Sequence, residues 1–384
     1  MAAKAEAAER PLRILHVLSQ RGFSGGENQL AAIVRHLHRA DYQQSFVLHP
    51  GAQFRSIADE IGAPVQELRM ANDVDLGAVL RLRGIFRRSD ADVISFGCAR
   101  GHKLGGLACA GAKGLPPRLA TRRMDYPLRG KLKRWLYRTA VQRVIVISEA
   151  VKEQVLHLGV PEAQVELIHE GVPSAELSAL RRPEARAAAR AELGIDGDVV
   201  LGVTLASLHE RKGLDLLIDA LSELALAPGQ RLLWCVGGQG PLLAELQKHA
   251  ASKAREGAEL RLLGQVSAQK LLAAADLFCL PSRLEGLGVA LLEAMASGLP
   301  AVASRVGGMQ DSLVDGETGF FAEPGEVDSL RSALERLLST PESWRQLGDA
   351  AAARAAERFD VQGMCRATER VYQELAVLGR RVPG

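Results

Sequence analysis

Short apolar runs rich in β-branched residues alternate with longer amphipathic stretches through the first half of the chain. The longer stretches, such as residues 27–39 and 76–88, place their apolar positions at the period of a helix. Strands that alternate with helices of this length are typical of a parallel sheet covered on both faces. We therefore predict strands at residues 13–18, 45–48, 92–96, 143–147 and 165–168.

The alternation stops between residues 173 and 198, where Ala, Arg and Glu dominate around Pro183, and we interpret this stretch as a connector of helical character. It then resumes, with strands predicted at 199–205, 231–236, 260–263, 277–280 and 300–304. The pattern predicts an α/β protein with two doubly wound, Rossmann-like domains that face a central cleft. Its expected parts are residues 1–172, the connector 173–198, residues 199–360 and a C-terminal segment, 361–384.

Composition narrows the class of protein. The 384 residues are 47% hydrophobic and 24% charged, as in a globular protein. A net charge of +3 is small for a nucleic-acid binder, so no nucleic-acid partner is expected. No apolar run approaches the ~18 residues that span a bilayer, and the first ten residues lack the apolar core of a signal peptide. The five cysteines form no CxxC pair, which favours reduced thiols and a cytoplasmic location.

The sequence "SGGEN" (24–28) follows the first predicted strand and opens the first predicted helix. Gly25 and Gly26 would let backbone N–H groups approach a phosphate at the helix N-terminus. The alternative is structural, because Ser24 and Glu27 have the spacing of a capping box.

Two cations, Arg211 and Lys212, stand directly before Gly213 and a predicted helix. Cations are unfavourable at a helix N-terminus, and a phosphate site there would explain them. The alternative is a solvated basic turn.

A third strand–glycine–helix junction, "CVGGQGPLLAEL" (235–246), resembles part of a dinucleotide fingerprint. Leu243 stands where the third glycine of GxGxxG is needed, which disfavours an NAD-dependent oxidoreductase. We interpret Gly238 as a donor-binding candidate where backbone approaches a ligand, or as part of a turn into a helix that starts at Pro241.

Two carboxylates flank the sequence "GLG" in "SRLEGLGVALLEAMASGLP" (282–300). Glu285 lies in a loop after a strand, and Glu293 follows eight residues later in an apolar helix, where an unpaired charge is costly. A continuous helix of that length rises about 12 Å, too far for a shared proton. The spacing suits two ends of one ligand, with a sugar's hydroxyl groups at one carboxylate and a ribose diol at the other. Between them, the N–H groups that would hold a diphosphate belong to Gly286, Leu287 and Gly288.

Two segments match a DxD metal motif, "DVD" (73–75) and "DAD" (90–92). Asp75 precedes a predicted helix as an N-cap would, and the second pair lies at the amino edge of the sheet. We therefore expect no metal.

A basic stretch, residues 118–143, interleaves Lys and Arg with Tyr and Trp, which suits an anionic membrane surface or acceptor. The alternative is a solvated helix.

Residues 285–321, "EGLGVALLEAMASGLPAVASRVGGMQDSLVDGETGFF", resemble the nucleotide-sugar signature of the retaining family-4 glycosyltransferases, whose fold is called GT-B. The shared pattern is Glu-x7-Glu, then Ala-x-Gly-x-Pro, Gly-Gly and Asp-Gly-x-Thr-Gly. "SGGE", "SEAV" (148–151), "IHEGV" (168–172) and "RKG" resemble that family in order and spacing. The resemblance covers roughly residues 12–360, and it implies a last helix, about 361–378, that crosses back to the first domain.

The resemblance implies that residues 1–172 bind the acceptor and that residues 199–360 bind the donor, a nucleoside-diphosphate sugar. It also assigns roles to residues by position. Glu285 resembles the acid that contacts the donor sugar and phosphates, and Arg211 and Lys212 resemble the cations at the diphosphate. The donor-binding positions that it implies are Glu293 at the ribose, Gly25 and Gly26 over the diphosphate, and Gln265 and Val266 at the nucleobase.

The chain departs from the family at two positions. "ASL" (206–208) stands where many members have an arginine, and "TRR" (121–123) stands where many have a Thr-x-His element. The acceptor candidates are therefore Arg122, Arg123 and His102. "TRRMDYPL" is similar to bacterial members that build lipopolysaccharide or other cell-surface glycans.

The expected reaction transfers a sugar to a hydroxyl of a glycan or lipid-linked acceptor, with retention and without metal or cofactor. The expected location is the cytoplasm, with peripheral contact to the inner face of an anionic membrane through residues 118–143. Two alternatives stay open: a related sugar phosphorylase or epimerase, and a non-catalytic subunit that binds nucleotide sugars.

Overall fold

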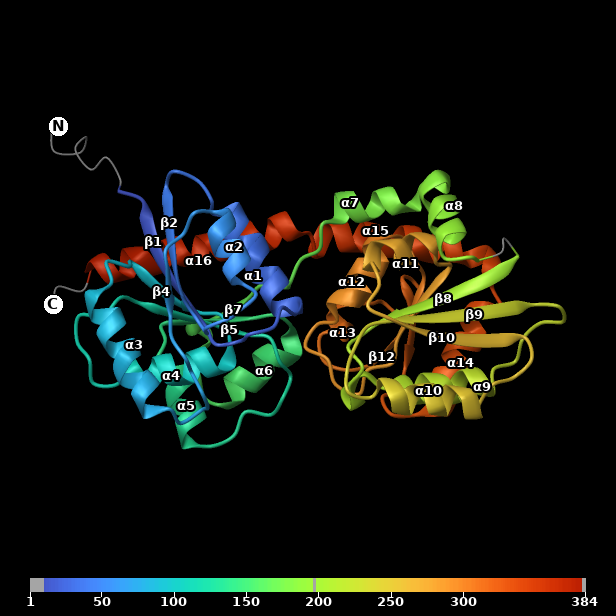
Figure 1. The fold of residues 1–384 in the computed structure, drawn as a ribbon, viewed down its shortest axis with the longest axis horizontal. Coiled ribbons are helices and arrows are strands. Elements are labelled where there is room, and N and C mark those ends of the chain that lie inside the picture. The colour runs from blue at the N-terminus through green and yellow to red at the C-terminus, as the bar shows by residue number, and fades with distance from the viewer. Residues whose placement is uncertain (1–9, 196–197, 382–384) are drawn as a thin grey trace. The chain divides into compact units, whose positions relative to one another are not determined.

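The computed structural model describes residues 10–195 and 198–381, and the chain divides into two compact units. The first comprises the chain up to His169 together with the residues from Gln362 onward, and the second comprises Glu170–Val361. Each unit is built on its own parallel sheet (Figure 1). The predicted α/β organisation with two Rossmann-like sheets is therefore present.

The first unit has a seven-stranded parallel sheet of order β3-β2-β1-β4-β5-β6-β7. Its elements are β1 (Leu12–Leu18), α1 (Gly25–His36), β2 (Tyr42–Leu48), α2 (Arg55–Glu60), β3 (Val65–Glu67), α3 (Leu76–Arg88), β4 (Val93–Phe96), α4 (Ala99–Cys109), β5 (Arg118–Arg122), α5 (Lys131–Arg138), β6 (Arg143–Val146), α6 (Glu149–His157), the 3₁₀ turn η1 (Glu162–Gln164), β7 (Val165–Leu167) and α16 (Val361–Arg381).

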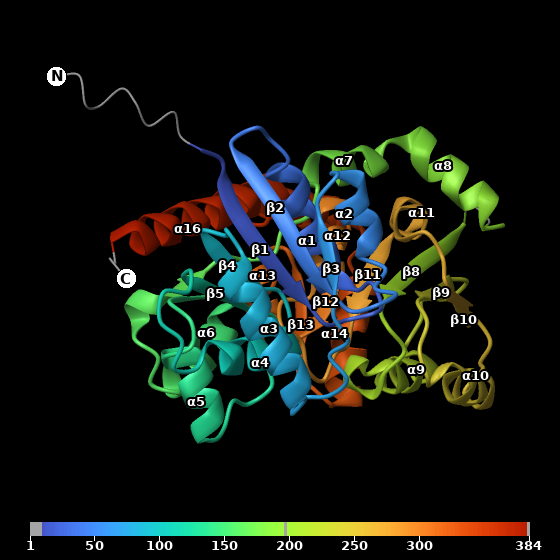
Figure 2. The same ribbon diagram turned by 60° about the vertical axis from the view of Figure 1, so that its left-hand side comes forward.

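Strand β4 shows how both faces of the first sheet are covered. Successive side chains of a strand point to opposite faces. The Ser95 hydroxyl lies 3.0 Å from the hydroxyl of Tyr372 on α16, whereas Phe96 packs against Phe86 of α3 and His102 of α4. Helix α16 therefore covers one face, and α3 and α4 cover the other (Figure 2).

The second unit has a six-stranded parallel sheet of order β10-β9-β8-β11-β12-β13. Its elements are α7 (Ser174–Ser178), η2 (Ala179–Arg181), α8 (Pro183–Glu192), β8 (Val199–Leu205), η3 (Glu210–Lys212), α9 (Leu214–Ser222), β9 (Arg231–Gly237), α10 (Leu243–Ser252), β10 (Ala258–Gly264), α11 (Ala268–Ala274), β11 (Leu277–Leu280), α12 (Val289–Ala296), β12 (Ala301–Ser304), α13 (Met309–Ser312), β13 (Gly319–Ala322), α14 (Val327–Leu338), η4 (Pro341–Ser343) and α15 (Trp344–Arg358).

Trp234 on β9 organises the core of the second unit. Its ring is fully buried, and its indole N–H donates to the Thr204 hydroxyl (3.1 Å), which donates to the Cys279 carbonyl (2.9 Å). A Cβ on Gly202 would stand only 2.2 Å from the Trp234 ring, so β8 needs glycine there. These contacts join three neighbouring strands and hold the carboxyl ends of β8 and β11 in place.

Residues 173–198, predicted as a connector, form helices α7 and α8 of the second unit as far as they are described. The Arg186 guanidinium binds the Asp276 carboxylate just before β11 (2.6 Å), and Arg190 binds the same group (3.3 Å). These ion pairs fasten α8 to the sheet, so the stretch is an integral part of the unit.

Three strands lie outside the predicted set: β3, β5 and β13. Strand β3 is a three-residue edge strand, too short to show a period. Strand β5, "RLATR", has arginine at both ends, so its apolar centre does not stand out from the basic stretch. Strand β13 lies inside the segment interpreted as a ligand signature.

Candidate active site

The strand order of the second sheet reverses between β8 and β11. The chain leaves these two neighbouring strands toward opposite faces of the sheet, which opens a crevice at their carboxyl ends where ligands of such sheets bind. Residues 206–213 follow β8 and residues 281–288 follow β11. These two loops carry Arg211, Lys212 and Glu285, so the sheet brings together the groups predicted as catalytic.

A buried ion pair lies at the centre of this crevice. The Lys212 ammonium donates to Oε2 of Glu285, and both side chains are almost fully buried, at 11% and 12% exposure. The Ser282 hydroxyl donates to the same carboxylate oxygen (3.2 Å), and an Arg211 guanidinium nitrogen lies 4.0 Å from Oε1. An ammonium has three donor hydrogens, so Lys212 can keep Glu285 and still bind a further anion.

The two loops are joined by contacts that the sequence analysis did not find. Arg283 forms a bidentate pair with Asp215 in the first turn of α9 (2.7 and 2.6 Å), and its backbone N–H donates to the Arg211 carbonyl (2.8 Å). Burial acts to raise the pKa of Asp215, and the bonds and charge of Arg283 outweigh it and lower the pKa below its ordinary value. The only sequence signal for this clamp is the opposite charge of two residues that follow different strands, one in a loop and one in the first turn of α9.

Gly213 and Gly288 supply backbone conformations that this junction requires. Gly213 is left-handed (φ 63°), and a Cβ there would lie 2.0 Å from the Pro281 carbonyl oxygen. Gly288 is also left-handed (φ 82°) and is the residue before α12. Glycine adopts this region without a Cβ penalty, and so it permits both the close approach and the sharp entry into the helix.

The loop before α12 presents backbone donors. Within the described part of the chain, no group accepts a hydrogen bond from the N–H of Glu285, Gly286, Leu287 or Gly288. The side chain of Leu287 is buried in the core, so its predicted contribution can come only from its backbone. Successive N–H groups ahead of a helix N-terminus can bind an anion, and the diphosphate predicted for these residues stays a prediction.

Glu293 lies in the second turn of α12, among buried apolar neighbours. It forms no side-chain hydrogen bond or ion pair with any residue that the structure describes. Burial raises its pKa from 4.5 to about 7. A half-buried carboxylate without a partner is a candidate acceptor for the hydroxyl groups of a ligand.

Three other donor-binding predictions fall in the second unit: Gln265, Val266 and Gly238. Gln265 and Val266 connect the carboxyl end of β10 to α11, and Gln265 is exposed. Gly238 has a different explanation, because a Cβ there would lie 1.8 Å from the Ala206 carbonyl oxygen. Close approach of the two chain segments accounts for this glycine without any ligand. The expected helix starting at Pro241 begins instead at Leu243.

In the first unit, "SGGE" forms the capping box that was the structural alternative. The Glu27 carboxylate accepts from the backbone N–H of Ser24 (3.0 Å) and from its hydroxyl. Gly25 and Gly26 are the first residues of α1. A Cβ on Gly26 would lie 3.1 Å from the side chain of Arg123, which is only partly buried and donates to the Gly97 carbonyl (2.9 Å).

His102, predicted as an acceptor candidate, does not fit that role. It is buried in α4 between Phe96 and Tyr137, and one ring nitrogen lies 3.2 Å from the Leu136 carbonyl. Burial lowers its pKa to about 4, so it is a neutral packing residue. Arg122 is also mostly buried, and it donates to the Tyr126 carbonyl (2.8 Å) and bonds Tyr137.

The DxD segments have structural partners. The Asp75 carboxylate caps α3 by accepting from the N–H of Ala78 (2.9 Å) and Ala71 (3.1 Å), which lowers its pKa. Asp92 accepts from the backbone N–H of Arg13 (3.0 Å). No group of three potential His, Cys, Asp or Glu ligands occurs among the described residues.

The basic stretch 118–143 comprises β5, a loop and α5. Helix α5 exposes Lys131, Lys133 and Arg134, together with Leu132 at 43% exposure, while it buries Leu136. No helix in the described residues is long and apolar enough to cross a membrane.

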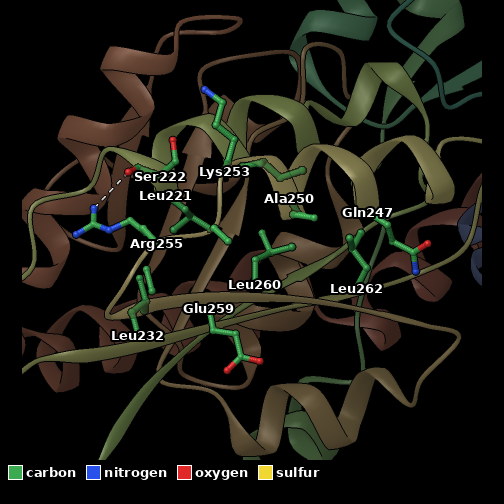
Figure 3. A pocket seen from close by; sticks show the side chains of 14 residues that line it. Leu221, Ser222, Leu232, Gln247, Ala250, Lys253, Arg255, Glu259, Leu260 and Leu262 are labelled. Atoms are coloured by element: carbon green, nitrogen blue, oxygen red, sulfur yellow. Dashed lines mark hydrogen bonds between the residues drawn. The ribbon is translucent and has the colours of Figure 1, made fainter.

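A separate groove of about 360 Å³ lies on the flank of the second unit, between α9, α10 and β10 (Figure 3). Its lining is mostly apolar. Arg255 at its edge donates to the carbonyls of Ser222 (3.4 Å) and Leu224, and Lys253 pairs with Asp219 (3.1 Å). The charged groups Arg255 and Lys253 at its edge therefore already have partners within the protein.

Comparison with known proteins agrees with this geometry. A family model described as Glycosyltransferase Family 4 matches residues 23–176, and one described as Glycosyl transferases group 1 matches residues 185–354. The crystal structure of Anabaena HepE in complex with UDP and glucose superposes with a TM-score of 0.79, at 20% identity, over 94% of this chain and 100% of that one. The predicted GT-B fold is thereby confirmed.

Curated relatives match over shorter regions. A GDP-mannose-dependent alpha-(1-6)-phosphatidylinositol monomannoside mannosyltransferase of Mycolicibacterium smegmatis is 38% identical over 43% of this chain and 45% of its own length. A D-inositol 3-phosphate glycosyltransferase of Streptomyces bingchenggensis is 31% identical over 61% of this chain and 53% of its own. The chain thus spans about half the length of these two relatives.

Proposed function

The chain belongs to the family-4 GT-B glycosyltransferases, and on that premise we propose that it transfers a sugar from a nucleoside-diphosphate sugar to an acceptor hydroxyl with retention of configuration. One observation carries the proposal: the buried Lys212–Glu285 pair lies at a sheet switch point, beside a run of N–H groups that have no acceptor among the described residues. A cation and backbone donors at one place suit a diphosphate leaving group.

The reaction breaks the bond between the anomeric carbon and the distal phosphate oxygen of the donor. Negative charge develops on that oxygen, and Lys212, Arg211 and the N–H groups of residues 286–288 stabilise it. Glu285 accepts hydrogen bonds from the hydroxyl groups of the donor sugar. We propose further that the acceptor oxygen attacks from the face of the departing phosphate, which takes the acceptor's proton.

The rest of the donor extends from this centre along the same crevice. Glu293 on α12 accepts hydrogen bonds from the ribose diol, and the backbone at Gln265 and Val266 meets the nucleobase. The relative from Mycolicibacterium smegmatis is named for GDP-mannose and HepE was crystallised with UDP, so both bases are tested below.

The acceptor in this proposal is a glycan or a lipid-linked glycan of the cell surface, lipopolysaccharide among them. Similarity of "TRRMDYPL" (121–128) to bacterial cell-surface glycosyltransferases supports it. Exposed Lys131, Lys133 and Arg134 next to exposed Leu132 support peripheral contact of α5 with an anionic membrane. Sedimentation with anionic and neutral vesicles tests this contact, and equal binding to both would contradict it.

The reaction is tested by incubating the protein with UDP- and GDP-sugars and a panel of glycan acceptors. We expect one donor to release free nucleoside diphosphate only when an acceptor is present, and the product's anomeric proton to show the donor's configuration by NMR. An inverted product would overturn the retaining mechanism. Nucleotide-sugar binding without turnover on any acceptor would identify a non-catalytic binding subunit instead.

A further inference from the structure

A second switch point, in the first sheet, adjoins a hollow that contains none of the residues proposed to bind the donor. The strand order of this sheet reverses between β1 and β4. The hollow, of about 890 Å³, is lined by residues that follow the carboxyl ends of four strands: Ser19–Arg21 after β1, His49 and Pro50 after β2, Arg69–Ala71 with Asp73 after β3, and Ala99 with Arg100 after β4. Its size suits a small-molecule ligand.

Arginines dominate the charge of this hollow. Arg21 and Arg69 are exposed, and neither side chain has a hydrogen bond or ion pair with any residue in the described ranges. The Arg21 guanidinium reaches from the end of β1 to the β2 loop, where it lies 3.8 Å from the position that a Cβ on Gly51 would take. Two guanidinium groups therefore stand at the hollow with their donors available.

The nearby carboxylates are already engaged. Asp73 accepts from Arg100 Nε (3.1 Å) and lies 3.6 Å from the Lys103 ammonium. Asp75, whose charge interacts with Arg69, accepts two backbone N–H groups as the cap of α3. The hollow is thus left with positive charge that no residue of its lining neutralises.

Helix α4 adds favourable potential for an anion. It begins at Ala99, which lines the hollow, and its eleven residues give it a developed dipole. The Cys98 thiol before it accepts from Gly101 N–H (3.3 Å), so only part of the first turn is capped by the chain itself. The helix N-terminus and the two arginines come from different elements and favour the same kind of ligand.

We propose that this hollow binds a phosphate ester carried by the acceptor, through the guanidinium groups of Arg21 and Arg69 and the N-terminus of α4. The inference rests on the proposed function, because it identifies the ligand as the acceptor. Guanidinium groups match phosphate by bidentate hydrogen bonds, and a phosphate brings the charge that two arginines can neutralise. The ester is either a phosphomonoester, as in a soluble sugar phosphate, or a phosphodiester, as in a lipid headgroup.

Calorimetric titration with soluble probes tests the proposal and separates the two sources. Glucose 6-phosphate represents the monoester, glycerophosphoinositol represents the lipid headgroup, and glucose and inositol are the uncharged controls. We expect one phosphorylated probe to bind and its uncharged counterpart not to bind. Tighter binding of glucose 6-phosphate indicates a soluble acceptor, and tighter binding of glycerophosphoinositol indicates a lipid headgroup.

The arginine variants localise the binding. The double variant R21Q/R69Q should weaken the bound probe by about 100-fold, since it loses two charge-assisted contacts. R87Q is the matched control, because Arg87 is exposed in the last turn of α3, at the amino edge of the same sheet. The proposal would be overturned if neither ester bound the wild-type protein. It would also be overturned if R87Q weakened binding as much as R21Q/R69Q does.

Titration of the same double variant with nucleotide distinguishes failure of the acceptor inference from failure of the proposed function. UDP or GDP should bind R21Q/R69Q as it binds the wild-type protein, because the donor groups lie in the second unit. Nucleotide binding without phosphate-ester binding would remove the acceptor inference alone. Failure of the wild-type protein to bind any nucleotide would remove the proposed function.

Discussion

The cations at the switch points of the two sheets differ in burial and in pairing. In the second sheet, Lys212 is buried and already paired with Glu285, which a second donor, Ser282, also holds. In the first sheet, Arg21 and Arg69 are exposed, and neither side chain has a hydrogen bond or ion pair with a described residue. A buried cation without a counter-charge is costly, whereas water solvates an exposed one.

This difference suggests different tasks for the two regions. A buried, fixed pair gives strong electrostatics where charge develops during a reaction, since its groups need no reorientation. Exposed arginines gain by binding an anion but lose side-chain entropy when they do, which suits a ligand that binds and leaves. We therefore assign chemistry to the second sheet and acceptor capture to the first.

The largest expected effect comes from removing the buried cation. In K212M, kcat/KM for glycosyl transfer should fall by about 10³-fold, because one preorganised charge at the leaving group is lost. K248M is the control, since Lys248 is an exposed lysine of α10 in the same unit. Transfer kinetics measure both variants, and an activity of K212M within threefold of the wild type would remove Lys212 from the mechanism.

Glu293 should make the stability of the protein depend on pH. Its folded pKa, about 7, exceeds the ordinary 4.5, so the folded state holds the proton more tightly. Its contribution to the free energy of unfolding is full below about pH 4.5 and is lost as the pH rises through 7. Between pH 4.5 and 8, the free energy of unfolding of E293Q should rise by about 3 kcal/mol relative to that of the wild type.

Urea unfolding of both proteins across this pH range measures that difference. E245Q is the control, because Glu245 is an exposed glutamate of α10. A constant difference between E293Q and the wild type at all pH values would show that folding does not raise the pKa of Glu293.

The Arg283–Asp215 clamp should have a smaller effect, on geometry more than on stability. Both side chains are about one-third or more exposed, so solvent weakens the pair, and R283Q should lower stability by no more than about 1 kcal/mol. The loop that carries Glu285 is then held less firmly, and kcat/KM should fall about tenfold. D215N should reproduce the effect, and the double variant should be no worse than either single one.

The smallest effect is expected at the cap of α3. D75A should lower the melting temperature by about 2 °C, since it removes the N-cap hydrogen bond. Transfer activity should stay the same, with or without EDTA. A loss of activity in D75A that Mn²⁺ restores would identify the DxD segment as a metal site and contradict our interpretation.

Most residues of the proposed donor site could be predicted from the sequence because that site is local. Strand, turn and helix follow one another along the chain there. Glu285 and Glu293 are marked by their spacing, and Lys212 is marked as a cation in front of a helix N-terminus. Strands β8 and β11 matched their predicted bounds for the same reason, since long apolar runs stand between turn residues.

The sequence could not reveal contacts that depend on three-dimensional proximity. The Arg283–Asp215 clamp joins residues 68 positions apart, and Gly238 is explained only by the carbonyl of Ala206. His102 was misjudged because its burial beneath α5 has no local sequence signal. The hollow at Arg21 and Arg69 was missed because its residues come from four separate segments of the chain.

The most direct test of this division of tasks is calorimetric titration of two ligands against two variants. The ligands are whichever of UDP and GDP binds the wild type, and whichever phosphate ester binds it. We predict that K212M loses the nucleotide and keeps the ester, and that R21Q/R69Q keeps the nucleotide and loses the ester. Loss of the ester in K212M, or loss of the nucleotide in R21Q/R69Q, would contradict the assignment of donor and acceptor to separate sheets.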